Sequence, residues 1–201
     1  MFSGETFSEI FTSSAGVGPT LADGTALFHT DHANLGSTAL SYTSWSATRT
    51  AMRAQTEFHS GERLGGLVTP KFLLVPPDLE ATALSILGSD LDPSEGSTTS
   101  YQAVNPHAAG DSRMARLASA RARTIVVDLW TDANNWAALA DPLMYPAIGI
   151  GYRFGRQPEV FSVASPTAGL MFTNDTLPIK VRFLYACGVI DHRGLYKHNV
   201  A

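Results

Sequence analysis

The stretch Lys71-Phe-Leu-Leu-Val-Pro-Pro-Asp-Leu-Glu-Ala-Thr-Ala-Leu-Ser-Ile-Leu-Gly88 predicts the unit around which the rest of the chain folds. Its first part, Phe72 to Val75, is a short continuous apolar run, which is typical of a strand covered on both faces. Pro76 ends the strand because it has no N–H to donate, and Pro77 suits the first turn of a helix. The sequence therefore predicts a buried strand, a tight turn and a helix that packs back on the sheet.

The helix of this unit has one apolar face and recognisable ends. Asp78 places a carboxylate near the positive N-terminus of the helix, and Gly88 stands where a left-handed C-cap residue is expected. Four apolar residues repeat with the spacing of one helix face: Leu79, Ala83, Ile86 and Leu87.

Length and composition indicate one domain, or one domain with an extension. The chain has 201 residues, of which 44% are hydrophobic, enough to bury a sizeable core. A formal net charge of −4 gives no basic field that would favour a dedicated nucleic-acid binder. The one cysteine, Cys187, excludes an internal disulfide framework. No apolar run reaches membrane-spanning length and no signal-peptide pattern is present, so we expect a soluble protein made in a reducing cytoplasm.

The segments before this unit predict two helices and a loop. Phe2 to Thr12 is typical of the last turns of a helix, and Leu21 to Leu40 predicts a loop with a short strand at Ala26 to His29. A second helix is expected to start at Ser44 or Ser46. The side chains expected on its buried face are Ala47, Ala51, Ala54 and Phe58.

The segments after this unit predict a surface loop followed by strands. Ser89 to Ser112 is polar and predicts a long loop, whereas Thr124 to Trp130 predicts a buried strand. Trp136 to Ala140 and Ile148 to Phe154 predict two further strands. A hairpin is expected next, with Gly169 to Thr173 paired to Ile179 to Ala186 about a turn at Asn174-Asp175. The predicted class is α+β, a mixed sheet with a few helices.

The most ligand-like cluster is His29-Thr-Asp31-His32. Two histidines with an aspartate between them could bind a divalent metal and serve a small metal-dependent hydrolase. However, spacing i, i+3 brings side chains together on a helix, and the glycines around this cluster favour a loop. Hydrogen bonding in a turn or an interface is therefore the preferred interpretation, and we expect neither a metal site nor a cofactor.

No other residues form a convincing catalytic set. Cys187 lies near Asp191 and His192, but it sits in an apolar strand, where free cysteine is usually a small buried hydrophobe. The chain has no nucleophile elbow, phosphate loop or dinucleotide fingerprint. We therefore expect no enzyme.

Four arginines are candidates for a subunit interface: Arg113, Arg116, Arg121 and Arg123. They could pair with acidic groups of a neighbouring subunit, form a solvated face, or contact nucleic acid, and we rank the three in that order. The loop from Asp90 to Gly110 is a second candidate interface.

Several motifs occur in an order that resembles the Mu-like major head subunit of tailed bacteriophages. The similarity runs from about Phe7 to the C-terminus, and several motifs in order are more specific than any one alone. The motifs are Asp23-Gly-Thr-Ala-Leu-Phe-His-Thr-Asp-His-Ala-Asn-Leu35, Ala51-Met-Arg-Ala-Gln55, Phe72-Leu-Leu-Val-Pro-Pro-Asp-Leu-Glu80, Trp136 with Ala140-Asp-Pro142, and Gly188-Val-Ile-Asp-His-Arg-Gly-Leu-Tyr-Lys197.

The resemblance implies the Hong Kong 97 capsid fold. Residues 1–40 would then be the end of the spine helix and a loop of the peripheral domain, 41–165 the axial domain, and 166–201 peripheral strands. The family's N-terminal arm, extended loop and most of the spine helix have no counterpart in this sequence, so we expect an N-terminally truncated member.

The resemblance also implies function and partners. The chain would be a major capsid subunit that assembles in the bacterial host cytoplasm into pentamers and hexamers of an icosahedral shell. Scaffold or prohead protease, portal and non-specifically packaged DNA would be its partners, with no membrane involved. The alternatives are the hydrolase above and a head decoration or completion protein, which would bind preformed shells.

Overall fold

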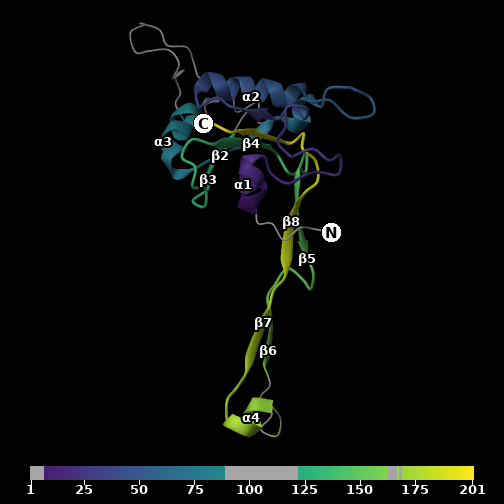
Figure 1. Cartoon of the computed structure of the whole chain (residues 1–201), viewed down its shortest axis with the longest axis vertical. Helices are drawn as coiled ribbons and strands as arrows, with labels where there is room; N and C mark the ends of the chain where they lie inside the picture. Colours follow the sequence, from purple (N-terminus) through teal and green to yellow (C-terminus); the bar gives the residue numbers. More distant parts are fainter. Residues whose placement is uncertain (1–6, 89–121, 163–166, 168) are drawn as a thin grey trace. The chain divides into compact units, whose positions relative to one another are not determined.

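The computed structural model describes residues 7–88, 122–162, 167 and 169–201. The described chain divides into two compact units (Figure 1). Unit 1 comprises Ile150–Gly188, and unit 2 comprises the described residues up to Gly149 together with Val189–Ala201. These boundaries differ from those of the predicted domains, whose assignment as axial and peripheral stays a prediction. The mixed α and β composition of the prediction is confirmed.

Unit 2 contains a mixed sheet of five strands. In spatial order these are β1 (Leu35–Gly36), β9 (Leu195–His198), β4 (Trp136–Ala140), β2 (Pro70–Val75) and β3 (Arg123–Val126). The two outer pairs are parallel, whereas β2 with β4 and β4 with β9 are antiparallel. The predicted strand Phe72 to Val75 thus lies within the sheet, and three of its side chains are fully buried: Leu73, Leu74 and Val75.

One face of this sheet is covered by α2 (Tyr42–Ala54) and α3 (Glu80–Gly88). The 3-10 turn Pro77–Leu79 leads directly from β2 into α3, as Pro76-Pro77 predicts. Ala83, Ile86 and Leu87 bury the predicted face of α3 against the sheet. Gly88 is the last helical residue with ordinary φ, so the predicted left-handed cap is wrong.

The other face of the sheet is covered by α1 (Phe7–Gly16), which Figure 1 shows on the side opposite α2. Phe11 packs against Phe28 and Trp130, with ring centroids 5.5 and 5.7 Å apart. Regular helix ends before Ser13, because Ser14 and Ala15 adopt left-handed backbone angles. The predicted helix end at Thr12 agrees with this change.

The start and the buried face of α2 differ from the prediction. Ser41 is the N-cap, and its hydroxyl accepts the Ser44 N–H while the Ser44 hydroxyl accepts the Ser41 N–H, which forms a capping box. The cap thus lies three residues before Ser44 and five before Ser46, the two predicted starts. The buried side is also different from the predicted one and is lined by Ser44, Trp45, Thr48 and Met52.

Two predicted strands in the described residues are wrong, and a third lies at the edge of the sheet although it was predicted to be buried. Ala26 to His29 forms only a single bridge from Ala26 to Thr20. Gly169 to Thr173 lies in a helix, α4 (Gly169–Asn174), which ends where Asp175 turns left-handed. The run Thr124 to Trp130 yields β3, which is an edge strand with alternating exposure and is not buried on both faces.

Strand β9 holds both layers of helices because its side chains alternate between the two faces. The fully buried Lys197 donates from Nζ to the carbonyl oxygens of Phe11 and Gly16, at 2.7 Å each. These carbonyls lie on either side of the left-handed turn that ends α1. Burial lowers the pKa of Lys197 to about 8. The sequence analysis proposed neither Lys197 nor its neighbour His198, which contacts α2, as a functional residue.

His198 points to the opposite face from Lys197. Its ring stacks on Trp136 with centroids 4.0 Å apart, and Nε2 lies 2.8 Å from the Thr48 hydroxyl on α2. Nδ1 accepts the Thr38 N–H at 3.2 Å, so the neutral ring satisfies both partners. The approach is so close that a Cβ on Gly36, beside His198 in the sheet, would overlap with the ring.

Replacement of Lys197 should test the anchoring of α1. In Lys197→Met, the buried Phe11 and Gly16 carbonyls lose their donor, and we expect the free energy of unfolding to fall by roughly 2–4 kcal/mol. Urea denaturation followed by circular dichroism measures the change. Lys180→Met, on an exposed lysine, is the matched control and should shift the value by less than about 0.5 kcal/mol. Equal stability of both variants would contradict the anchoring role.

The stability of unit 2 should depend on pH through His198. Burial lowers the pKa of His198 from 6.5 to about 4. Between these values the unfolded chain binds a proton that the folded chain does not, so stability is full above pH 6.5 and falls as the pH drops toward 4. His198→Gln should reduce this fall, whereas exposed His59→Gln should retain it. Thermal unfolding from pH 7 to 4 measures both, and an unchanged slope in His198→Gln would refute the assignment.

Candidate assembly surface

Unit 1 is a two-stranded ribbon with a helix at its turn. β5 (Ile148–Tyr152) pairs with β8 (Tyr185–Val189), and β6 (Glu159–Ser162) pairs antiparallel with β7 (Ile179–Arg182). The predicted partner of β7 was Gly169 to Thr173, and the structure gives β6 instead. The chain therefore runs out along one strand, passes through α4, and returns along the other.

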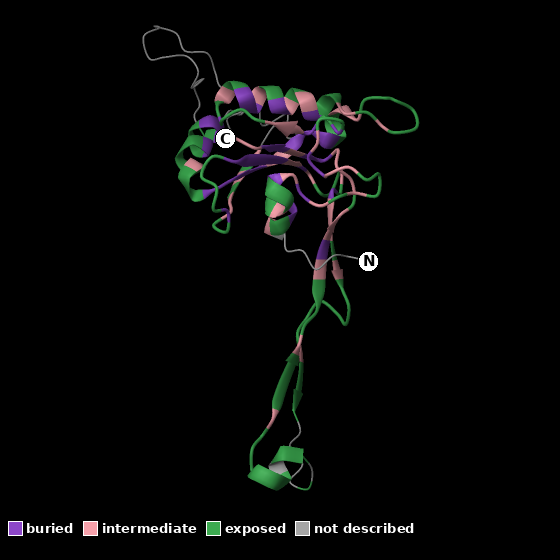
Figure 2. Ribbon diagram, viewed as in Figure 1, coloured by how far each residue is buried: buried purple, intermediate pink, exposed green. Residues whose placement is uncertain are grey.

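The ribbon has almost no interior of its own. Among the described residues of unit 1, Cys187 alone is buried, and Figure 2 colours most of the ribbon as exposed. Unit 1 nevertheless contributes most of the large apolar side chains that are exposed in the described chain. A two-stranded hairpin is at best marginally stable in water, and exposed apolar patches mark interaction sites.

One face of the β6–β7 ladder is apolar. Residues paired across an antiparallel ladder share a face, and successive residues alternate between faces. The register pairs Val160 with Val181 and Ser162 with Ile179, which puts these four on one face. Val160, Val181 and Ile179 are exposed to 66, 63 and 64%. This face, which we call the ribbon apolar face, has the composition of a sheet surface that another chain covers.

The other face of the ladder satisfies its own charges. Arg182 donates from Nε to Glu159, opposite it in the register, at 2.9 Å. The Arg182 guanidinium also lies over the ring of Phe154, 3.8 Å from its centroid, and 5.1 Å from that of Phe161. Such contacts stabilise a cation without a second chain. The two faces thus differ: the face with Arg182 has an ion pair and cation–π contacts of its own, whereas the ribbon apolar face exposes Val160, Val181 and Ile179.

The predicted interface arginines fall largely outside the described residues. Arg113, Arg116, Arg121 and the loop from Asp90 to Gly110 lie there, so their role stays a prediction. Arg123 is described and exposed, and it begins the edge strand β3. The structure therefore describes only one of the four arginines, and the interface role of the set stays a prediction.

The His29, Asp31 and His32 cluster stabilises a loop. His32 uses both ring nitrogens, with Nδ1 3.0 Å from Leu27 O and Nε2 2.8 Å from Asp23 Oδ2. His29 Nδ1 accepts the Asp31 N–H at 3.2 Å. The Thr25 N–H, followed by His32, lowers the pKa of the Asp23 carboxyl. This is the turn hydrogen bonding that the sequence favours.

The C-terminal segment packs against this loop. The ring of His192 stacks on that of His32 with centroids 4.0 Å apart, and burial lowers the pKa of His192. Asp191 accepts the Tyr145 hydroxyl at 2.7 Å and Arg193 Nη1 at 2.9 Å. Burial raises the Asp191 pKa, but these donors and the Arg193 N–H outweigh it and lower the pKa overall. Desolvation, together with Asp191, raises the pKa of Tyr145 to about 12.

No catalytic or metal-binding arrangement emerges from these groups. In the parts of the chain that the structure describes, no group of three or more His, Cys, Asp or Glu side chains could hold a metal ion. Cys187 is buried in β8, which agrees with a small hydrophobic role. Likewise, none of the described helices is both long and apolar enough to cross a bilayer.

Comparison with known protein families identifies the family of the chain. A family model described as phage capsid protein matches residues 2–198. The chain belongs to this family of phage capsid proteins. Searches of curated proteins and of solved structures found no match. The match spans both units, including the ribbon.

Membership in the phage capsid family gives the chain a structural role in the virion capsid. A capsid protein associates with copies of itself into a shell. The sequence analysis missed β6 and its two apolar residues, Val160 and Phe161. The apolar and polar alternation from Ile179 to Arg182 was the one signal for this surface.

Substitutions on the ribbon apolar face should weaken self-association without unfolding the chain. Threonine keeps the β-branched shape that strands favour, so Val160→Thr/Val181→Thr should preserve the ribbon while removing apolar surface. We expect the concentration at which half of the chain associates to rise tenfold or more, measured by light scattering. Lys180→Thr, on the other face, is the matched control. Equal association of both variants would show that this face is not an assembly surface.

Proposed function

We propose that the chain is the major capsid subunit of a tailed bacteriophage or prophage, of the Mu-like kind, and that it builds an icosahedral shell around DNA. The observation that carries the proposal is the ribbon, which exposes an apolar face and has no core of its own among its described residues. The family match over residues 2–198 supports the structural role. The ordered motifs of the sequence support the Mu-like assignment.

The proposal includes the Hong Kong 97 capsid fold. Unit 2, with helices on both faces of a mixed sheet, is our candidate for the axial domain, and the ribbon for strands of the peripheral domain. The sequence-based boundary between the two was residue 165. Because β6 pairs with β7, we propose to move the boundary to about Ile150, so that both sides of the ribbon belong to one element.

The proposed partners follow from the role of the subunit. Other copies of the chain would form pentamers and hexamers in the host cytoplasm, with scaffold or prohead protease and a portal as further partners. Packaged DNA would contact the shell interior non-specifically, since a net charge of −4 provides no overall attraction for phosphate.

Two other functions were considered. The metal-dependent hydrolase is not favoured, because His32 commits both ring nitrogens to Leu27 and Asp23. A head decoration or completion protein remains a distinct candidate of the same structural class. It would bind preformed shells and would not associate with itself.

The test is assembly of the purified chain. We expect light scattering to show growth with rising concentration, and negative-stain electron microscopy to show rings, sheets or shells. Repeating the measurement at several salt concentrations separates charge contacts, which salt weakens, from apolar contacts, which salt does not screen. A chain that stays monomeric at every concentration, yet binds preformed shells, would replace the proposal with the decoration role.

A further inference from the structure

A rigid finger follows α2 in unit 2. The segment from Thr56 to Arg63, which we call the Phe58 finger, is closed by the Thr56–Arg63 bridge and by the Glu57 N–H, which donates to Glu62 O at 2.8 Å. At its tip, Glu57 Oε2 accepts the His59 N–H at 3.0 Å. These bonds use the backbone and the Glu57 carboxylate to hold the shape of the turn.

Phe58 stands on this finger with 79% of its surface exposed. The sequence pattern placed it on the buried face of α2, but the helix ends at Ala54 and the capping residue Gln55 turns the chain away. A large aromatic ring on a preorganised support loses little entropy when it binds, and such rings dominate the energy of interfaces. Phe58 is therefore a candidate for contact with another apolar surface.

A groove lies at the other end of α2. It has a volume of about 500 Å³ and is formed where the start of α2 meets α3. Leu40, Tyr42 and Ile86 supply apolar surface, and the remaining lining is uncharged. An aromatic side chain can thus enter this groove without desolvating a charge.

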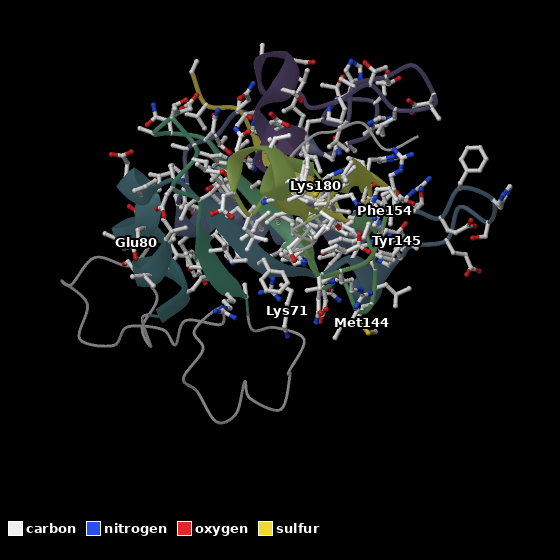
Figure 3. All side chains as sticks on the ribbon, turned by 90° about the horizontal axis from the view of Figure 1, so that it is seen from below. Lys71, Glu80, Met144, Tyr145, Phe154 and Lys180 are labelled. Carbon is white, nitrogen blue, oxygen red and sulfur yellow. The ribbon has the colours of Figure 1, made fainter. Side chains whose placement is uncertain are left out.

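The finger and the groove face different directions within one rigid unit. The groove includes Tyr42, the first residue of α2, and the finger starts after Ala54, the last, about 20 Å away along the helix. Figures 1 and 3 both show α3, on which Glu80 is labelled, at one end of unit 2 and the loop after α2 at the other. A finger therefore cannot fill the groove of its own chain.

The charges at the two ends of α2 are complementary. At the finger end, Arg49, Arg53 and Arg63 line one groove of about 510 Å³. Burial, followed by the neighbouring Arg53, lowers the pKa of Arg49. At the groove end, Asp78 and Glu80 are exposed at the start of α3. The finger itself carries Glu57 and Glu62, so the complementary charge comes from the arginine groove beside it. That groove and the acidic start of α3 favour head-to-tail contact over contact between like ends.

We propose that the Phe58 finger of one copy inserts into the α2–α3 groove of the next copy. This inference rests on the proposed function and identifies the contact within a ring of subunits. Two different surfaces on each copy make a heterologous contact, and a heterologous contact that closes on itself gives a ring. The arginines beside the finger then lie toward Asp78 and Glu80 of the neighbouring copy.

Disulfide trapping tests the contact directly. Phe58→Cys/Thr82→Cys places one thiol on the finger and one in the groove, and mild oxidation should give a ladder of covalent oligomers on a non-reducing gel. Each single variant should give no species beyond a dimer, since the native Cys187 is buried. Leu143→Cys/Thr82→Cys, with a thiol at a 92% exposed position elsewhere, is the matched control and should give no ladder.

A second variant separates this inference from the proposed function. Phe58→Ala should fold normally and raise the half-association concentration tenfold or more, whereas Leu143→Ala should not. If Phe58→Ala associates like the wild type, or dimers of Phe58→Cys alone account for all cross-links, the finger-to-groove contact is wrong and the capsid role stands. A wild-type chain that never associates overturns both.

Discussion

The alternation of side chains along β9 is the constraint on which unit 2 depends. Consecutive residues of a strand point to opposite faces, so Lys197 and His198 contact different layers. Lys197 holds the end of α1 through the Phe11 and Gly16 carbonyls, and His198 holds α2 through Thr48. Both side chains are polar and buried, and each reaches partners that satisfy it, which is the condition for burying polar groups without a large penalty. A slip of one residue in β9 would exchange the two faces and lose both sets of contacts.

The pairing of β9 with β4 also explains how the ribbon is connected to unit 2. β4 and β9 are antiparallel neighbours, yet the whole ribbon lies between them in sequence. The ribbon is therefore an insertion whose two ends are held together by the pairing of β4 with β9. The pairing of β4 with β9 does not involve the side chains of the ribbon. The ribbon can therefore carry an apolar face that its own chain does not cover. Unit 2 buries a core of its own, whereas most of the described side chains of unit 1 are exposed.

The strongest local patterns predicted their elements correctly. The apolar run Phe72 to Val75 and the face with Ala83 and Ile86 needed only local information, because prolines and helical spacing determine them. Predictions failed where contacts between residues far apart in the sequence determine the structure. The buried side of α2 depends on His198, which is about 150 residues from Thr48, and β6 replaced the predicted hairpin partner of β7. The candidate surfaces were predicted only in part: alternation indicated Ile179 and Val181, but no local signal showed that Phe58 lies beyond the end of its helix.

Stability of the ribbon and association of the chain are linked through mass action. Anything that binds only the ordered ribbon stabilises it in proportion to the logarithm of its concentration. For a capsid protein the partner is another copy of the same chain, so a ribbon that contacts other copies would be stabilised as the concentration of the chain rises. Unit 2 differs, because its core side chains, such as Trp45 and Leu73, are buried within one chain. The subunit thus combines a part that buries a core within one chain with a part whose apolar side chains are exposed in the single chain.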